Sequence, residues 1–279
     1  MIDNKIKYGL LIFLLLTIIF VVTYNIWNNN RVQLTNIDIG DVNVPAALKG
    51  LRIVQVSDFH NSTFGQDQSR LLDKLKEAKP DLILITGDLI DKRNTKIEIA
   101  VDFVREARHI APIYFVSGNH ESWLPDYELL KSRLKEAGVI VLDNESVILK
   151  SGQSTLKLAG IIDPGFSEGS DKEKIVRESL ASIKGESADF SILLAHRPDL
   201  FEVYERFDYD LIFSGHAHGG QFRFPFIGGL LAPDQGLIPK YDSGLYRLGK
   251  TIMIVSRGLG NSLFPFRLFN GPELIVVEL

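Results

Sequence analysis

The chain has 279 residues, of which 45% are hydrophobic and 24% are charged. This composition is typical of a folded protein with one large domain or two small ones, and it argues against a disordered chain. The formal net charge of −4 gives no general attraction to nucleic acid. The sequence contains no cysteine, which excludes disulfide bonds and thiolate ligands, so nitrogen and oxygen atoms must hold any bound metal.

A run without charged side chains spans residues 8–27. It is long enough for a helix to cross a hydrocarbon core of about 30 Å. Lys5 and Lys7 precede the run, so the positive-inside rule favours a cytoplasmic N-terminus and a chain that continues outside the cytoplasm. Because no small-residue cleavage site ends the run, we expect an uncleaved, single-pass anchor in the cell membrane rather than a signal peptide.

The segment after this run is polar and then apolar again, with a proline at position 45. It is typical of a stalk that leads into a first edge strand. We therefore expect three parts: a membrane anchor at 1–30, a stalk with an edge strand at 31–49, and a globular domain at 50–279.

In the first part of the domain, apolar runs alternate with amphipathic patterns. The runs predict buried strands at 51–57, 81–86 and 112–117. The amphipathic patterns predict helices at 67–79, 95–109 and 126–137. This βαβαβα order is typical of α/β proteins.

After residue 138 the pattern changes to short strands around one predicted helix at 172–183. The strands are expected at 139–142, 146–150, 156–162, 190–195, 210–214, 251–256 and 273–279. A half so rich in strands need not be wholly parallel. We therefore expect an α/β domain in which two packed, mainly mixed β-sheets are flanked by helices.

Five of the six histidines fall in short polar clusters directly after predicted buried strands. They are His60, His120, His196, His216 and His218. In open α/β sheets, ligands bind at the carboxyl ends of strands, so clusters far apart in sequence can converge there. The exception is His109, near the end of a predicted helix, where we expect a surface or capping role.

Several clusters combine residue types that suit metal binding. Asp58 and His60 are two positions apart at a strand end, which points a carboxylate and an imidazole into one space. Asp88 follows a glycine that permits a tight turn, and its two oxygens can bridge two cations. Asn119 offers an amide oxygen beside His120, which is free for another role. Each fragment alone is common by chance, but together they predict one metal site.

These clusters, in this order, resemble the motifs of the calcineurin-like metallophosphoesterases over roughly residues 50–279. The matching fragments are Asp58-x-His60, Gly87-Asp88, Gly118-Asn119-His120-Glu121, His196 and Gly215-His216-x-His218. Two glycine-rich segments, at 219–221 and 256–260, are similar to the membrane-associated bacterial phosphodiesterase branch of that family. The resemblance implies a four-layer sandwich and phosphoester hydrolysis by a hydroxide that bridges two divalent metals.

Carried over by position, the resemblance implies two metal sites joined by the carboxylate of Asp88. The ligands of the first site would be Asp58, His60 and His218, and those of the second Asn119, His196 and His216. His120 would then donate a proton to the leaving oxygen or stabilise charge on the phosphoryl group. Either Glu121 or Asp91 could orient it. Four histidines among seven ligands disfavour Mg²⁺, and we expect Mn²⁺, with Fe, Zn²⁺ and Mg²⁺ as alternatives.

Arg197 follows His196 at a position where related bacterial proteins often have an asparagine. It could bind a substrate phosphate or form an ion pair on the surface, and we favour the surface ion pair, because charged loop residues are usually solvated. Arg257 has the same two alternatives.

Two aromatic stretches, at 221–231 and 263–269, could pack in the core or form an apolar rim that touches lipid. In the second case, Arg223 and Arg267 would lie at the level of lipid headgroups.

The sequence thus predicts an enzyme that hydrolyses a phosphodiester, phosphomonoester or pyrophosphate. We expect a small or lipid-linked phosphoester as substrate and a membrane as a partner. One alternative is a membrane-tethered scaffold without activity, which would be expected to lack some metal ligands. Another is a nuclease, but the chain lacks the basic stripe that a polyanion requires, so we expect no nucleic-acid partner.

Overall fold

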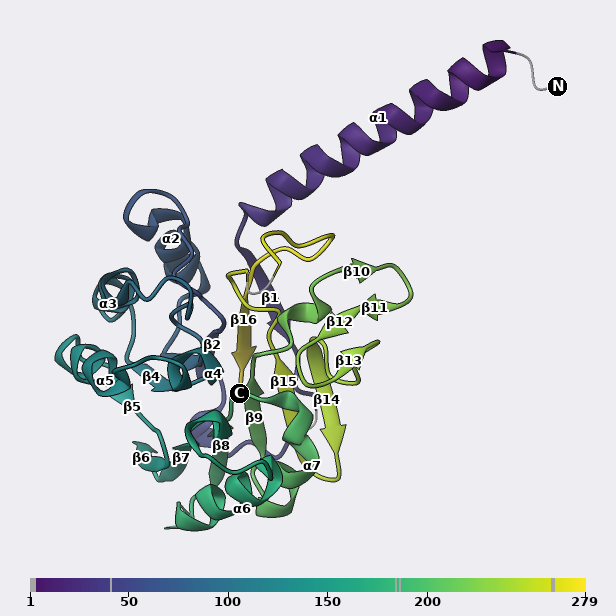
Figure 1. Ribbon diagram of the computed structural model, residues 1–279. Helices are drawn as coiled ribbons and strands as arrows, with labels where there is room; N and C mark the ends of the chain where they lie inside the picture. The colour runs from purple at the N-terminus through teal and green to yellow at the C-terminus, as the bar shows by residue number, and fades with distance from the viewer. Residues whose placement is uncertain (1–3, 41, 184, 186, 262–263) are drawn as a thin grey trace.

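The computed structural model describes residues 4–40, 42–183, 185, 187–261 and 264–279. Two six-stranded sheets pack face to face, and helices cover their outer faces (Figure 1). The long helix α1 (Asn4–Asn29) projects away from this sandwich. The predicted α/β fold, with two mixed sheets between layers of helices, is confirmed.

The first sheet has the strand order β1-β16-β2-β3-β4-β5. The strands are β1 (Gln33–Ile37), β16 (Glu273–Glu278), β2 (Arg52–Val56), β3 (Leu82–Thr86), β4 (Ile113–Val116) and β5 (Ile140–Val141). Strands β2 to β5 are parallel, whereas β16 runs antiparallel to β2. The outer face packs against α2 (Ser69–Ala78), α3 (Ile97–Ala107) and α5 (Tyr127–Glu136), whose apolar stripes are buried there.

The second sheet has the order β14-β15-β9-β8-β7-β6. The strands are β14 (Gly244–Leu248), β15 (Thr251–Val255), β9 (Leu211–Ser214), β8 (Phe190–Leu194), β7 (Ser154–Gly160) and β6 (Glu145–Ser151). The four central strands are parallel, and the two edge strands are antiparallel to their neighbours. Helices α6 (Lys172–Ser182) and α7 (Phe201–Tyr204) pack on its outer face.

Short elements occupy the loops. They include α4 (Asn119–Ser122), β10 (Arg223–Phe224), β11 (Gly228–Gly229), β12 (Leu231–Ala232) and β13 (Gly236–Leu237). The 3₁₀ helices are Ala46–Leu48, Gln66–Gln68, Pro164–Phe166, Pro198–Leu200, Glu205–Phe207 and His218–Gly220. The predicted helix at 67–79 begins later, at Ser69, because Asp67 and Gln68 adopt positive φ angles.

Helix α1 enters the domain at the edge where the central strands end. Strand β1 begins directly after α1, runs parallel to β16, and is therefore antiparallel to β2, β3 and β4. Its first residue consequently lies at the edge of the sheet where those three strands finish (Figure 1). We call this edge, with the loops that follow β2, β3, β4, β8 and β9, the loop edge.

Candidate metal centre

The loops of the loop edge hold several site residues in an unusual backbone conformation. Asp58, His60, Asp88, His216 and His218 all have φ between 48° and 65°, a region that costs a residue with a side chain about 1 kcal/mol or more. Hydrogen bonds between the first two loops hold this geometry: the N–H of Asp58 donates to Gly87 O at 3.1 Å, and that of His60 to Asp88 O at 3.0 Å. The loops therefore form one interlocked unit.

A first group of four side chains converges at the ends of β2, β3 and β9. Donor atoms of Asp58, His60, Asp88 and His218 all lie within 4.8 Å of one another, and all four residues are buried. The Nε2 atoms of His60 and His218 are 3.2 Å apart, and His218 Nε2 is 3.4 Å from Asp58 Oδ1. The two imidazoles and two carboxylates, gathered in a buried space, form a donor set that suits a cation.

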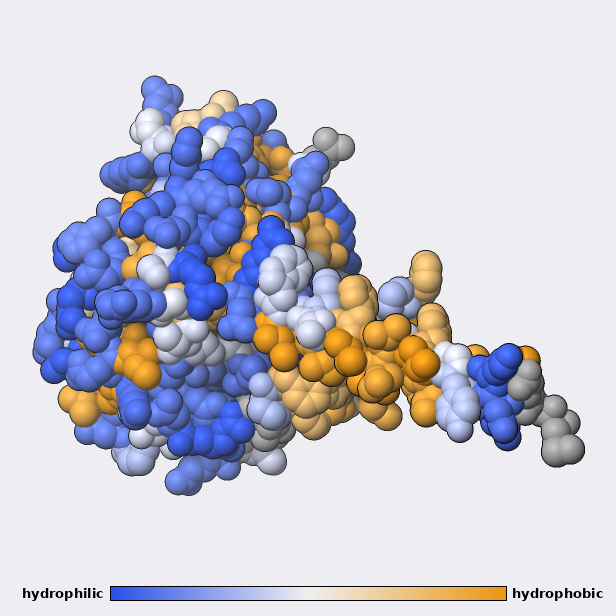
Figure 2. Space-filling model, turned by 90° about the horizontal axis from the view of Figure 1, so that it is seen from above, coloured by the Kyte–Doolittle hydropathy of each residue, from blue (hydrophilic) through white to orange (hydrophobic). Residues whose placement is uncertain are grey.

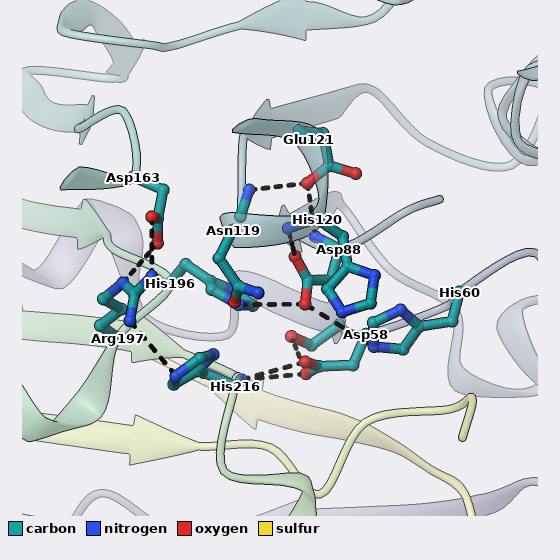
Figure 3. A network of polar contacts seen from close by, with 12 residues as sticks. Asp58, His60, Asp88, Asn119, His120, Glu121, Asp163, His196, Arg197 and His216 are labelled. Carbon is teal, nitrogen blue, oxygen red and sulfur yellow. Dashed lines mark hydrogen bonds and ion pairs between the residues drawn. The ribbon is translucent and has the colours of Figure 1, made fainter. Parts of the chain in front are cut away.

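A second group shares Asp88 with the first. Donor atoms of Asp88, His196 and His216 lie within 4.8 Å of one another. His196 Nε2 is 3.4 Å from Asp88 Oδ2 and 3.1 Å from Asn119 Oδ1, so the asparagine joins this group (Figure 3). All seven side chains predicted as ligands are thus brought together, and Asp88 lies between the two groups.

Two of these histidines use one ring nitrogen for a hydrogen bond to an oxygen atom, which is the usual arrangement in a histidine that binds a metal through its other ring nitrogen. His196 Nδ1 lies 2.7 Å from the carbonyl oxygen of Thr86, to which it can only donate, so in the neutral imidazole Nε2 carries no proton and faces Asp88. His216 Nε2 is 3.0 Å from Asp234 Oδ2, which leaves its Nδ1 available. The two buried groups therefore fit divalent metal ions in donor type and in orientation.

The electrostatics of the site differ from one proposed ligand to the next. Burial acts to lower the pKa of His196, but the carboxylates of Asp88, Asp58 and Asp163 outweigh it and raise that pKa to about 10, so this imidazole is protonated until a cation displaces the proton. Burial lowers the pKa of His60 to about 3, and it also lowers the pKa of His218 well below the usual value. Both imidazoles are therefore neutral, the form that binds metals. Burial acts to raise the pKa of Asp88, but the nearby His196 outweighs it and holds that pKa well below the usual range. Asp88 is thus an ionised carboxylate.

His120 lies beside both groups and is oriented by the loop after β3. Its Nδ1 accepts the backbone N–H of Lys92 at 3.1 Å, so the proton of a neutral imidazole must reside on Nε2. Asp91, one of the two candidates for orienting it, has its Oδ1 3.9 Å from that Nδ1. The other candidate, Glu121, instead accepts N–H groups from Asp88 at 2.8 Å and Gly118 at 2.7 Å, and so ties the two loops together.

Arg197 is buried, so the surface ion pair that we favoured from the sequence is wrong. Its Nε and Nη2 contact the two carboxylate oxygens of Asp163 at 2.7 and 3.0 Å. Its Nη1 pairs with Asp234 and lies 3.5 Å from His216 Nε2. Asp163 follows β7 as the other site residues follow their strands, so the same sequence signal could have found it. Asp234 lies in a loop without such a signal.

Arg267 is also buried, so it does not lie at the level of lipid headgroups, where the lipid-contacting alternative would place it. Its side chain is fully buried, its Nη1 donates to Arg257 O at 2.6 Å, and its Nη2 lies 3.3 Å from His218 Nδ1. Arg223 pairs with Asp242 at 2.8 Å. Arg257, for which two roles were open, pairs with Glu273 of β16 at 2.6 Å.

A cavity of about 400 Å³ opens above the metal-ligand groups. Four cationic side chains line it: Lys92, Arg93, Lys172 and Arg197. Trp123 also lines the cavity, with Lys92 Nζ 3.6 Å from the centroid of its ring. No sequence motif marked Lys92, Arg93, Lys172 or Trp123 as site residues. We call the four cationic side chains the basic wall; two of them, Lys172 and Arg197, pair with Asp234, which also lines the cavity. A floor of candidate metal ligands beside a basic wall suits an anionic ligand.

Comparison with known proteins gives consistent matches. A family model described as calcineurin-like phosphoesterase matches residues 51–220. The uncharacterized metallophosphoesterase YkuE of Bacillus subtilis (strain 168) is 31% identical over 242 residues, which cover 85% of this chain and 81% of YkuE. The phosphodiesterase YaeI of Escherichia coli (strain K12) is 30% identical over 234 residues and 82% of each chain.

A transmembrane protein with metallophosphoesterase domain from Danio rerio is also similar, with 29% identity over 265 residues. The match covers 88% of this chain and 57% of that longer protein. Together with α1, which is long and apolar enough to span a membrane, this likeness suggests membrane association.

Proposed function

Because the chain belongs to the calcineurin-like phosphoesterase family, we propose that it hydrolyses a phosphoester bond with two divalent metal ions that share the carboxylate of Asp88. The observation that carries this proposal is the position of Asp88, which belongs to both groups of converging donor atoms: its Oδ2 lies 3.6 Å from His60 Nε2 and 3.4 Å from His196 Nε2. Two cations there would act as Lewis acids that activate water and neutralise phosphoryl charge. The first metal would be held by Asp58, His60 and His218, and the second by Asn119, His196 and His216.

Four of the seven ligands are histidines, so we propose Mn²⁺ as the metal in preference to Mg²⁺. Elemental analysis of the purified protein tests this choice. We expect about two equivalents of a transition metal in each chain, whereas one equivalent would contradict the shared site.

His120 and the basic wall would act on the phosphoryl group. The fixed Lys92 contact leaves the proton of His120 on Nε2, from which it can pass to the leaving oxygen. Arg197 is held by Asp163 beside His216, where its guanidinium can pair with a phosphate oxygen. These roles use groups that already line the cavity above the metal ligands.

The substrate is proposed to be a small or lipid-linked phosphoester of a membrane. YaeI is named a phosphodiesterase, which supports a phosphodiester as the first class to test. The entry of α1 at the loop edge supports a substrate that lies in or near the bilayer. We further propose the expected topology, a single-pass anchor at 1–30 and a catalytic domain at 50–279 outside the cytoplasm, joined by 31–49.

The experiment compares Asp88→Asn with His109→Ala, which removes an exposed histidine distant from the site. Both variants are purified with Mn²⁺ and assayed on an aryl phosphodiester and an aryl phosphomonoester, and bound metal is measured. We expect Asp88→Asn to lose at least about 1,000-fold in kcat and part of its metal, because one carboxylate oxygen is replaced by a poor ligand. His109→Ala should match the parent. Full activity of Asp88→Asn would refute the mechanism, and an inactive parent that binds two metals would favour the scaffold.

A further inference from the structure

We propose that the globular domain itself rests on the bilayer, through an exposed apolar surface beside α1. We call this surface the aromatic face. It consists of Phe224, Phe226, Ile227, Phe264, Phe266 and Phe269. Phe226 is fully exposed, Ile227 is 59% exposed and Phe266 is 53% exposed. Large apolar side chains gathered on one surface are costly in water and mark a contact with a partner.

Two segments far apart in sequence form this face as one unit. Phe224, Phe226 and Ile227 belong to the hairpin of β10 and β11, and the other three belong to the loop before β16. The N–H of Arg223 donates to Leu268 O at 2.9 Å, which joins the hairpin to that loop. Leu263, the first residue of the second aromatic stretch, lies outside the described residues. Of the remaining aromatic side chains in the two stretches, Phe224, Phe226, Phe264, Phe266 and Phe269 are exposed rather than packed in the core. Phe222 is partly buried, with its ring against those of Phe264 and Phe266.

The aromatic face is fixed to the last turns of α1. The N–H of Phe269 donates to Asn25 Oδ1 at 2.8 Å, and Asn29 Nδ2 donates to Arg267 O at 2.9 Å. The rings of Tyr24 and Phe269 lie 5.9 Å apart. Because these contacts hold the loop against the helix, the loop must take the depth in the membrane that this part of α1 takes.

That depth is within the apolar part of the helix. A cavity of about 550 Å³ between α1 and the loop is lined by Val21 and Val22 on one side and by Phe266 and Leu268 on the other. Val21 precedes Trp27, the end of the uncharged run, by six residues, or about 9 Å along the helix axis. The loop therefore lies level with residues of α1 that are inside the apolar span. Figure 2 shows that the apolar surface of α1 continues to the point where the helix meets the domain. This is why the occupant is the bilayer and not another protein.

The other side of the helix base carries the polar groups expected at headgroup level. Trp27, Arg31 and Arg70 line a second cavity between α1 and α2, and the guanidinium of Arg31 lies 5.2 Å from the centroid of the Trp27 ring. Tryptophan and arginine are enriched where a helix leaves the membrane. The end of α1 thus has the aromatic face on one side, which would contact the acyl chains, and basic side chains on the other, which would contact lipid headgroups.

This arrangement turns the loop edge towards the bilayer. Ser62 and Gly260 line the cavity beside α1, and the backbone N–H of Gly260 donates to Asp58 O at 2.6 Å. The loop that carries Asp58 and His60 is therefore a neighbour of the membrane contact. Phosphoesters at headgroup level would lie close to the proposed metal ions.

The experiment uses the absence of cysteine from the 279-residue chain. A single spin label is placed at Phe226→Cys or, as control, at Ile140→Cys, and each protein is reconstituted in liposomes of phosphatidylcholine and phosphatidylglycerol. Ile140 is also an exposed apolar residue, 39% accessible, but it lies at the start of β5, away from the loop edge. Accessibility of each label to oxygen and to a water-soluble nickel chelate is then measured.

We expect the label at 226 to be several-fold more accessible to oxygen relative to the nickel chelate than the label at 140. Equal ratios at both positions would overturn the proposal. Spin–spin broadening at 226 that disappears on dilution with unlabelled chains would also overturn it, because the face would then contact a second copy. Neither measurement depends on catalysis, so the result stands apart from the proposed function. Thermal unfolding of both variants at the temperature of the parent, followed by circular dichroism, verifies folding.

Discussion

The metal-ligand groups and the aromatic face lie at the same end of the molecule, but they depart from ordinary burial in opposite ways. At the first, ionisable side chains are buried, with Asp58 fully enclosed and Asp88 1% exposed. At the second, large apolar side chains such as Phe226 are in contact with solvent. A buried charge is costly without a counter-charge, and an exposed apolar surface is costly without a cover. Each region therefore fits the partner that we propose for it, cations in one case and a bilayer in the other.

The two regions also differ in what holds them. The ligand loops are interlocked by buried hydrogen bonds, such as those that Glu121 accepts from Asp88 and Gly118. The aromatic face is held at its rear, through Asn25 and Asn29 of α1, while its apolar side chains remain uncovered. Substitutions in the first region should therefore change chemistry, and those in the second should change only the relation to the membrane.

The largest effect is expected from His120→Asn, which removes the proposed proton donor. We expect kcat for an aryl phosphate ester to fall by about 100- to 10,000-fold, because general acid catalysis contributes roughly that factor. Bound metal should stay unchanged, since His120 is not among the proposed ligands. Steady-state kinetics and elemental analysis measure the two effects, with His109→Asn as the matched control. Loss of metal together with activity would instead make His120 a ligand.

A smaller effect is expected from Arg197→Lys. The lysine keeps the charge but cannot contact both oxygens of Asp163 and also reach a phosphate. We expect KM to rise by about 10-fold with a lesser change in kcat, because one good charge-assisted hydrogen bond to the substrate is lost. Arg133→Lys alters an exposed ion pair with Glu98 and should leave both constants unchanged. An unaltered KM in Arg197→Lys would limit Arg197 to a structural role.

The smallest effect on the soluble protein is expected from Phe226→Ser. Because this side chain is fully exposed, its loss should change the free energy of unfolding by no more than about 0.5 kcal/mol. Phe115→Ala, in the core of the first sheet, should cost about 3–5 kcal/mol. Denaturant titration of both variants in detergent gives the comparison. A loss near that of Phe115→Ala would mean that Phe226 packs against the protein.

The sequence by itself determined most strands of the two six-stranded sheets, the long helices and the seven proposed ligands. These features are local: an apolar run marks a buried strand, and the polar residue that follows it is placed at the strand end by the chain itself, as for Asp58 and Asp88. The resemblance in motif order then related these fragments to one family, although each fragment alone is uninformative. Strand β14 was not predicted, because its residues are only partly buried and show no regular alternation.

Only the tertiary structure decided what depends on convergence and exposure. In the sequence, Arg197 has the pattern of a solvated charge in a loop. Its partner Asp163 follows a different strand, so only the fold brings the two side chains together. Arg267 and Phe266 are neighbours in one aromatic stretch, yet the arginine is buried next to His218 and the phenylalanine is exposed beside α1. A core segment and a membrane-facing segment can have the same composition. Which of the two a segment becomes depends on the surface that covers its side chains, and distant parts of the chain supply that surface.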